Sequence, residues 1–184
     1  ALIPAVIEKF GRAPDLLANN AALFAGGDWG DLPAAALAEM MQVNLSAPVM
    51  LGKALVAASK GQRPAIVNIV DQRVIHPVPD QIAYSLSKSA LWQATATLAV
   101  AFGGRARINA VAPGLTMATG DYSSAQVERL AKLMPLGALP TPAQIADAVV
   151  YLARAEAVTG QTIFVDGGAH LAPMGRDFVA LERD

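Results

Sequence analysis

The sequence predicts an α/β protein built on a doubly wound parallel sheet. Three observations support this fold class. Short apolar, β-branched runs alternate along the chain with longer segments whose apolar residues recur at helical spacing. The short runs are apolar throughout, which is typical of strands buried on both faces of a sheet. No internal repeat or linker interrupts the chain, so we expect residues 1–184 to form a single domain.

The expected elements follow one another in a regular order. They are the end of a helix at 3–10, a strand at 16–18, a helical stretch at 32–59, a strand at 65–70, a helix at 82–102, a strand at 106–111, helices at 124–133 and 142–155, and a strand at 162–165. Helical spacing places each helix, and a short β-branched run places most strands. Because strands and helices alternate, we expect parallel pairing with helices on both faces of the sheet.

Glycine and proline mark the boundaries of these elements. Gly11 stops the first helical pattern, and Gly103 ends the longest one. The stretch at 32–59 is interrupted near Asn44 and Pro48, because proline lacks the N–H that a helix interior uses. We therefore expect an interrupted helix there.

Composition and charge restrict the class of protein. The 14 basic and 15 acidic residues give a formal charge of −1, without the basic excess of a nucleic-acid-binding protein. Apolar residues make up 54% and charged residues 16%, so we expect burial of apolar surface between subunits. No apolar run of about 18 residues and no secretory signal pattern occurs. These features predict a cytoplasmic protein that does not insert into a membrane.

The side chains available for chemistry are equally restricted. The sequence has no cysteine and two histidines, His76 and His170. This excludes disulfides, thiol catalysis and a Cys/His zinc site within the sequence. Neither histidine has a neighbour in the sequence that argues for catalysis. We therefore expect oxygen and amine groups to act on a small-molecule substrate.

Three polar segments come directly after predicted strands. They contain Asn20, Asp71 and the pair Pro113-Gly114. In doubly wound sheets the ligand crevice lies beyond the carboxyl ends of the strands. We therefore expect these three segments to meet at one site.

Tyr84 and Lys88 are the most informative pair near that edge. Their four-residue offset stacks a phenol and an ammonium on one face of the predicted helix. A free phenol has a pKa near 10, and a nearby cation lowers the pKa of that phenol by favouring the phenolate. A tyrosine of this kind can protonate a developing anion. Taken alone, the pair also fits a solvated helix face.

Five ordered motifs give the pair its context. They are Asn19-Asn20-Ala21-Ala22, Val43-Asn44-Leu45, Tyr84 with Lys88, Ile108-Asn109-Ala110-Val111-Ala112-Pro113-Gly114, and Gly160-Gln161 leading to Val165-Asp166-Gly167-Gly168. Together they resemble the short-chain dehydrogenase/reductase family over nearly the whole chain, which implies a Rossmann-like fold. The resemblance implies hydride transfer from a nicotinamide cofactor, with Tyr84 as proton donor. It also implies that Lys88 holds the nicotinamide ribose and lowers the pKa of Tyr84, and that Asn44 positions a water linking Lys88 to solvent. An amide that bends a helix is a second interpretation of Asn44, compatible with the first.

One position departs from the family pattern. The family generally has a serine thirteen residues before the tyrosine, and this chain has Asp71 there. A serine hydroxyl can donate to a carbonyl oxygen, whereas an ionised aspartate only accepts and would repel a forming alkoxide. A carboxylate instead suits a substrate that presents N–H donors, or a C=N bond whose nitrogen gains a proton. As an alternative, Asp71 could cap the turn that follows the strand.

The Asp71, Tyr84 and Lys88 arrangement resembles the pteridine reductase and dihydromonapterin reductase branch of the family. Asn20-Ala21-Ala22-Leu23-Phe24 is similar to a segment whose phenylalanine stacks on the pterin in that branch, which implies the same role for Phe24. The branch has a serine where this chain has Ala22, so one expected hydrogen bond is in doubt. A core position beneath the loop is the alternative for Phe24.

The resemblance also implies the remaining cofactor contacts. Asn20, Ala21 and Ala22 would approach the cofactor after the first strand, and Pro113-Gly114-Leu115-Thr116 would pass along the nicotinamide. We expect NADPH as the cofactor, with NADH not excluded. Residues 117–136 are expected to form a lid over the substrate. The glycine-rich phosphate loop of such folds does not occur in the sequence, so we expect a preceding segment to be missing from it.

These observations predict an NAD(P)H-dependent oxidoreductase that reduces a C=N bond of a pterin or a similar heterocycle, with proton delivery through Tyr84 and Asp71. One alternative is a short-chain dehydrogenase acting on another alcohol or carbonyl compound. A second is a catalytically silent protein that binds a nucleotide for regulation or scaffolding. By resemblance we expect a homodimer or homotetramer assembled through the helices at 40–58 and 82–102.

Overall fold

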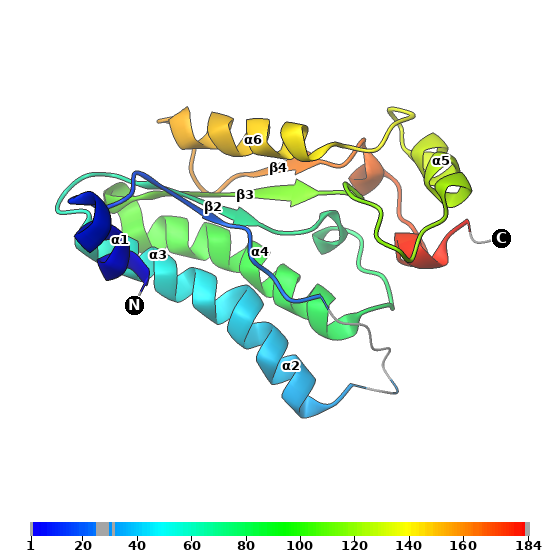
Figure 1. Ribbon diagram of the computed structural model, residues 1–184, viewed down its shortest axis with the longest axis horizontal. Coiled ribbons are helices and arrows are strands. Elements are labelled where there is room, and N and C mark those ends of the chain that lie inside the picture. Colours follow the sequence, from blue (N-terminus) through cyan, green and yellow to red (C-terminus); the bar gives the residue numbers. More distant parts are fainter. Residues whose placement is uncertain (1, 25–29, 31, 183–184) are drawn as a thin grey trace.

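The computed structural model describes residues 2–24, 30 and 32–182 and contains a four-stranded parallel sheet (Figure 1). The strands are β1 (Leu16–Asn19), β2 (Ala65–Ile69), β3 (Arg107–Pro113) and β4 (Thr162–Val165). The helices are α1 (Leu2–Phe10), α2 (Ala34–Met41), α3 (Ala47–Ala58), α4 (Ile82–Phe102), α5 (Ser124–Leu133) and α6 (Pro142–Arg154). The strands lie in the order β1-β2-β3-β4. The α/β class and the parallel sheet predicted from the sequence are confirmed.

Helices cover both faces of the sheet (Figure 1). On one face, Leu55 of α3 and Ala99 of α4 pack against Ile66 and Ile108. On the other face, Leu152 of α6 packs in a separate cluster with β2 and β3. All four strands run in one direction and in chain order, so the connection over α6 has the opposite hand to those through α3 and α4.

The ends of α4 and α6 show why sequence rules placed these helices well. α4 begins after Gln81, whose φ of 46° lies in the left-handed region, and ends at Gly103 with φ of 55°. Thr141 and Gln144 form a reciprocal capping box at the start of α6. At the other end of α6, Arg107 donates from its guanidinium to three carbonyls, those of residues 152, 153 and 155. The long helix at 82–102 matches its predicted bounds.

The predicted interruption of the 32–59 stretch is a single wide π turn between α2 and α3. This turn spans Gln42–Ser46 and contains the buried Asn44, while Pro48 lies in the first turn of α3. The segment Ala34–Ala58 is long and apolar enough to cross a membrane, with a mean hydropathy of 1.2. Leu55 in this segment packs against the sheet, 17% of the apolar window is buried, and one such helix is weak evidence for a membrane span.

The carboxyl ends of the strands form the functional edge. β1 lies at one side of the sheet, where Leu16 is partly exposed. β2 and β3 lie at the centre and are buried almost throughout. The chain leaves β2 at Asp71 and β3 at Gly114, so both segments enter the same crevice.

Candidate active site

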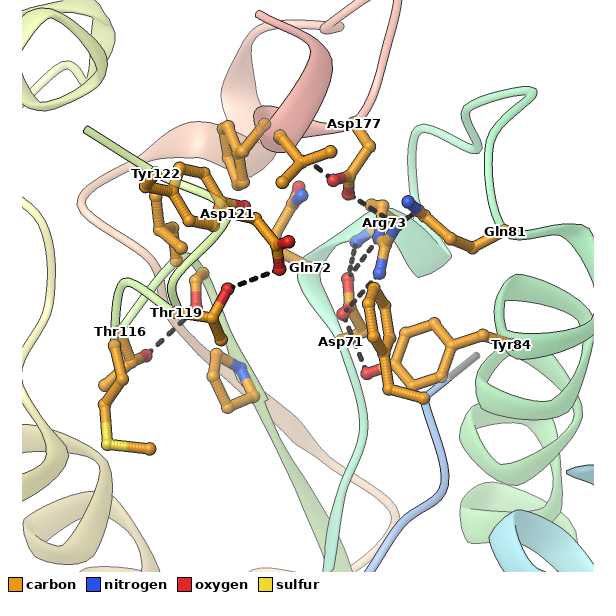
Figure 2. A pocket seen from close by; sticks show the side chains of 17 residues that line it. Asp71, Gln72, Arg73, Gln81, Tyr84, Thr116, Thr119, Asp121, Tyr122 and Asp177 are labelled. Carbon is orange, nitrogen blue, oxygen red and sulfur yellow. Dashed lines mark hydrogen bonds and ion pairs between the residues drawn. The ribbon is translucent and has the colours of Figure 1, made fainter. Parts of the chain in front are cut away.

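A cleft of about 560 Å³ lies beyond the carboxyl ends of β2 and β3 (Figure 2). Four parts of the chain contribute its walls: the loop after β1, the turn after β2 with the start of α4, the segment after β3, and the C-terminal segment. Its lining includes Phe24, Asp71, Arg73, Gln81, Tyr84, Pro113, Gly114, Leu115, Thr116, Asp121 and Asp177. The convergence predicted for Asp71 and Pro113-Gly114 is therefore observed.

Asp71 caps the turn after β2, as one of the two interpretations from the sequence expected, and its side chain also reaches Tyr84. Its Oδ1 accepts from the backbone N–H of Arg73 at 2.9 Å, which caps the short 3₁₀ turn Gln72–Val74. Its Oδ2 accepts from the hydroxyl of Tyr84 at 3.1 Å. The capping bond fixes the side chain against the turn, and the second bond couples the carboxylate to the phenol. Asp71 thus faces the cleft and does not point away from it.

Arg73 is the main component of the site that sequence reasoning missed. Its Nε and Nη2 donate to the two oxygens of Asp71 at 3.1 and 3.2 Å, and its Nη1 donates to Asp177 at 2.7 Å and to Gln81 at 2.8 Å. Its guanidinium carbon lies 5.0 Å from the centre of the Tyr84 ring. An Asp-x-Arg spacing after a strand is the sequence signal that could have indicated this fork.

The structure corrects the expected ionisation of Tyr84. Burial and the Asp71 carboxylate raise the pKa of Tyr84 above its usual value, and Arg73 opposes the shift only in part. The sequence spacing indicated a cation on the same helix face, but it did not indicate the depth of burial or the hydrogen bond to a carboxylate. Tyr84 in the free protein therefore keeps its proton, and its hydroxyl donates a hydrogen bond to Asp71.

Lys88 lies beneath Tyr84 and is almost fully buried. Its Nζ is 5.7 Å from the centre of the Tyr84 ring and donates to the backbone carbonyl of Ile69 at 2.7 Å. Burial lowers the pKa of Lys88 to about 8, against a smaller opposing effect of Asp71. An ammonium has three N–H donors. In the described part of the chain one of them is used, and the others remain for hydroxyl groups of a ligand.

Asn44 joins the loop after β1 to the helical layer. Its Oδ1 accepts from Leu23 N–H at 2.8 Å, and its Nδ2 donates to the Leu23 carbonyl and the Ser87 hydroxyl at 2.9 and 3.0 Å. Its position in the π turn supports the interpretation of an amide in a bent helix. Both amide hydrogens are used, so the observed contacts hold the loop that carries Phe24.

Phe24 lies at the cleft and not in the core. Its side chain is 60% exposed, and its ring meets that of Tyr84 edge-on with the centroids 4.8 Å apart. The alternative of a core position is therefore wrong. Asn20, Ala21 and Ala22 are exposed along the same loop but do not line the cleft.

The segment Pro113-Gly114-Leu115-Thr116 forms the opposite wall of the cleft. A Cβ on Gly114 would come within 2.8 Å of Asp166 Cβ, just beyond β4. Close packing between the ends of β3 and β4 is thus one reason for glycine at this position. The Thr116 hydroxyl donates to the Gly114 carbonyl at 2.9 Å, which holds the turn.

The expected lid at 117–136 is only partly a cleft wall. Thr119, Asp121 and Tyr122 line the cleft, whereas Met134 is buried in a cluster with the C-terminal segment. The C-terminal segment contributes Asp177 to the site, and no pattern in the sequence indicated this residue.

His170 lies outside this cleft. Its Nδ1 is 2.8 Å from the buried Asp166, so this histidine has a partner that the sequence did not indicate. Among the described residues, no group of side chains could hold a metal ion.

The donor set fits the nicotinamide half of a dinucleotide. The two remaining N–H donors of Lys88 suit the vicinal hydroxyls of a ribose. Thr116 of the turn at 113–116 and Tyr84 lie on opposite sides of the cleft (Figure 2). Lys88 and this turn would hold the cofactor, which when bound supplies the hydride.

The parallel sheet and the Asp71, Tyr84 and Lys88 cluster define a dinucleotide-binding type of α/β protein. A family model described as Enoyl-(Acyl carrier protein) reductase matches residues 1–170. The chain belongs to the short-chain dehydrogenase/reductase family, whose members use NAD(P)H. The resemblance inferred from the sequence is thus confirmed.

Two of the similar proteins are, by name, a dihydromonapterin reductase and an alternative dihydrofolate reductase. The dihydromonapterin reductase of Klebsiella pneumoniae is 36% identical over 137 residues, covering 72% of this chain and 56% of the relative. The crystal structure of FolM alternative dihydrofolate reductase 1 from Brucella suis, in complex with NADP, has a TM-score of 0.84 and 38% identity. It covers 93% of this chain and 68% of that one.

Other similar proteins have different substrates. The 2-(S)-hydroxypropyl-CoM dehydrogenase 3 of Xanthobacter autotrophicus is 36% identical over 165 residues, or 83% of this chain and 64% of the relative. The landomycin C-6 ketoreductase LanV, solved with NADP and rabelomycin, has a TM-score of 0.77 and 32% identity, covering 93% of this chain and 68% of that one. The chain spans from about half to two thirds of the length of these relatives.

Proposed function

We propose that this chain forms the catalytic part of an NADPH-dependent reductase for a C=N bond in a pterin or a similar heterocycle. One observation carries this proposal: the Asp71 carboxylate faces the cleft and accepts a hydrogen bond from the Tyr84 hydroxyl at 3.1 Å. The proposed activity thus rests on the carboxylate of Asp71 as a hydrogen-bond acceptor in the cleft. Similarity to a dihydromonapterin reductase and an alternative dihydrofolate reductase is additional support.

The charge of Asp71 distinguishes the two kinds of substrate. Reduction of a ketone places negative charge on an oxygen, which a neighbouring carboxylate destabilises. Reduction of a C=N bond requires a proton on nitrogen, and an amino-substituted heterocycle presents N–H donors that a carboxylate can bind. The fork from Arg73 balances one negative charge, and its hydrogen bonds go to Asp71, Gln81 and Asp177.

Phe24 and Tyr84 support the choice of a flat substrate. The exposed Phe24 ring borders the cleft opposite the turn at 113–116, and a heterocycle that lies against an aromatic face gains stacking energy. Tyr84 carries the proton and Asp71 holds the phenol in place. Proton delivery to the ring nitrogen therefore runs through the hydrogen-bonded pair of Tyr84 and Asp71.

Reduction of a carbonyl compound is the second candidate, because LanV is a ketoreductase. The two functions are separated by following NADPH oxidation by the purified enzyme with a dihydropterin and with a panel of ketones. The proposal predicts a higher kcat/KM for the dihydropterin. Faster turnover of a ketone would contradict it, and no oxidation with any substrate would favour the silent, nucleotide-binding alternative.

We also propose that the enzyme acts in the cytoplasm as a homodimer or homotetramer built through α3 and α4. Met50, Leu86 and Val100 on these helices are exposed in the single chain. A second copy would remove these apolar side chains from water. Light scattering of the purified enzyme should give at least twice the mass of one chain, and a monomer would contradict the assembly.

A further inference from the structure

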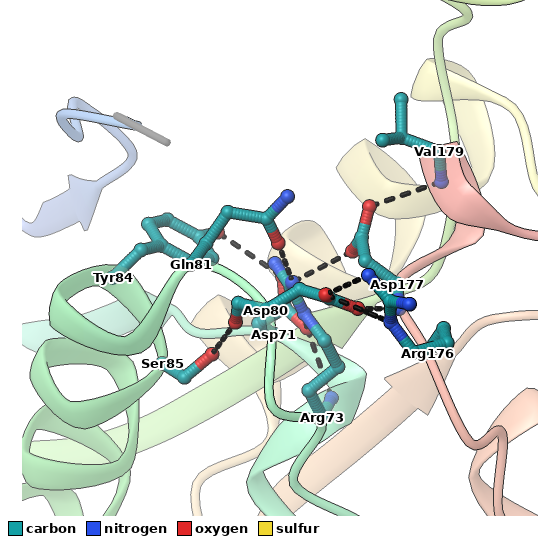
Figure 3. A network of polar contacts seen from close by, with 9 residues as sticks. All are labelled: Asp71, Arg73, Asp80, Gln81, Tyr84, Ser85, Arg176, Asp177 and Val179. Carbon is teal, nitrogen blue, oxygen red and sulfur yellow. Dashed lines mark hydrogen bonds and ion pairs between the residues drawn. The ribbon is translucent and has the colours of Figure 1, made fainter. Parts of the chain in front are cut away.

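A chain of charged contacts connects the C-terminal segment with Tyr84 (Figure 3). Asp80, which precedes α4, accepts from the backbone N–H of Asp177 at 2.6 Å and from the guanidinium of Arg176. Asp177 in turn accepts from Arg73 at 2.7 Å, and Arg73 donates to Asp71. The last link is the hydroxyl of Tyr84 on Asp71.

The centre of this chain is an ion triad in which Arg73 and Asp177 are buried and Asp71 is half-buried at the cleft. Arg73 and Asp177 are each 7% exposed. Burial by itself would lower the pKa of Arg73, but the Asp71 and Asp177 carboxylates outweigh it and the pKa is raised. The cation therefore stays charged while shared between two anions. Taking one charge away from such a triad leaves an imbalance that the interior cannot screen.

We propose that Arg73 is a positioning residue that keeps the Asp71 carboxylate a hydrogen-bond acceptor. Asp177 of the C-terminal segment shares the positive charge of Arg73 with Asp71, so the C-terminal segment affects how strongly Arg73 stabilises Asp71 as an acceptor. The proposal rests on the proposed function of Asp71. Arg73 acts through the groups that it holds: its Nε and Nη2 donate to Asp71, its Nη1 donates to Asp177, and its guanidinium lies against Tyr84.

The charged and titratable groups around Asp71 come from each neighbouring element. Arg73 lies in the same turn, Tyr84 and Lys88 face Asp71 from α4, Asp177 approaches from the C-terminal segment, and Asp121 lines the same cleft. Of these groups, Arg73 touches both Asp71 and Asp177. The two partners of Arg73 therefore compete for a single cation.

This competition predicts opposite effects for two substitutions that break the same contact. In Arg73→Gln the two carboxylates face each other without a cation, which favours protonation of Asp71. The acid limb of the kcat/KM profile should move to higher pH by about one unit. In Asp177→Asn the whole charge of Arg73 acts on Asp71, so the acid limb should stay in place or move to lower pH.

The test measures the pH profile of kcat/KM for both variants, with thermal unfolding as a second readout. Arg105→Gln, which alters an exposed guanidinium at the end of α4, is the matched control and should leave the profile unchanged. The double variant Arg73→Gln with Asp177→Asn should give an acid limb between those of the single variants. An acid limb that moves to higher pH in Arg73→Gln, while that of Asp177→Asn stays in place or moves to lower pH, would support the proposal.

If Arg73 and Asp177 only hold the C-terminal segment in place, the pH profiles of the two variants should show another pattern. Both single variants would then loosen residues 176–181 and lower activity in parallel, with no separation of their acid limbs. Limited proteolysis of that segment measures the loosening directly. Acid limbs that move together, or not at all, would overturn the proposal. If the dihydropterin is not a substrate, the proposed function fails, and the same profiles measured with the best ketone still decide the role of Arg73.

Discussion

The two sides of Tyr84 differ in chemistry and in origin. On one side Lys88 is buried against the backbone carbonyl of Ile69, and the hydroxyl of the adjacent Ser87 accepts from the neutral amide of Asn44. On the other side Asp71 belongs to a chain of ions that runs through Arg73 to the C-terminal segment. The first side offers N–H donors, whereas the second offers an acceptor.

This difference indicates that the two sides of Tyr84 suit different ligands. A cation with spare donors suits the hydroxyls of a cofactor ribose, and a carboxylate in the open cleft suits the N–H groups of a substrate. Tyr84 stands between them and contacts Asp71 directly at 3.1 Å. Substitutions on the two sides should therefore affect different kinetic parameters, with Tyr84 itself giving the largest loss.

Tyr84→Phe removes the proton donor and keeps the ring. We expect kcat to fall by about 100-fold or more, since a positioned acid contributes roughly 10²–10⁴ to a rate. The affinity for NADPH should change little, because Phe24 and Lys88 keep their contacts with an aromatic ring. Stopped-flow NADPH oxidation and a fluorescence titration measure the two quantities. A variant that retains more than half of the turnover would show that the proton comes from elsewhere.

Asn44→Ala tests the side of Tyr84 that carries neutral groups, and the quantity to measure is thermal stability. The change leaves the backbone N–H and carbonyl of Leu23 without their amide partner, at a cost of about 1–3 kcal/mol. The Tm should fall by about 2–4 °C for each kcal/mol in a protein of this size. Asn20→Ala, at an exposed position in the same loop, is the control and should leave the Tm within about a degree. An equal loss in both variants would contradict the assigned role of Asn44.

The ionisation of Lys88 should make the affinity for NADPH depend on pH. Burial lowers the pKa of Lys88 to about 8, so the free enzyme loses this cation as the pH rises through 8. If NADPH prefers the ammonium, binding above pH 8 must take up a proton, and the affinity should fall by up to about tenfold per pH unit. Titrations at pH 7 and pH 9 measure the change. Lys88→Met should bind weakly with nearly equal affinity at both values, and a wild-type affinity that does not change would refute the assignment.

Phe24→Leu should have the smallest effect of this series. It keeps an apolar side chain at the mouth of the cleft but removes the face on which a heterocycle stacks. A stacked pair contributes about 0.5–1.5 kcal/mol, which corresponds to a roughly 2- to 12-fold loss in kcat/KM for a dihydropterin. For a small aliphatic ketone the value should remain the same. Equal losses for both substrates would mean that Phe24 only shapes the cleft.

The sequence was sufficient for the parts of the fold that depend on local rules. The bounds of α4 and β4 match the prediction, because helical spacing, a terminal glycine and short apolar runs are local signals. The interruption near Asn44 was also predicted, although its form as a π turn was not. β3 extends to Pro113, two residues beyond the predicted end, because pairing with β4 continues there.

The charged half of the site depended on contacts that no local rule describes. Asp177 lies 104 positions from Arg73 in sequence, and their contact follows from the path of the C-terminal segment over the cleft. The pKa of Tyr84 was predicted in the wrong direction for the same reason. Helix spacing indicates which side chains share a face, but burial and a carboxylate from another element determine the ionisation.

The most direct test of the account compares substrates in Asp71→Ser. The quantity to measure is the ratio of kcat/KM for a dihydropterin to kcat/KM for a ketone, in the wild type and in the variant. The account predicts that the ratio falls by about tenfold or more, because a hydroxyl no longer accepts from N–H groups as an anion does and no longer repels a forming alkoxide. An unchanged ratio would contradict the account and leave Asp71 with its capping role alone.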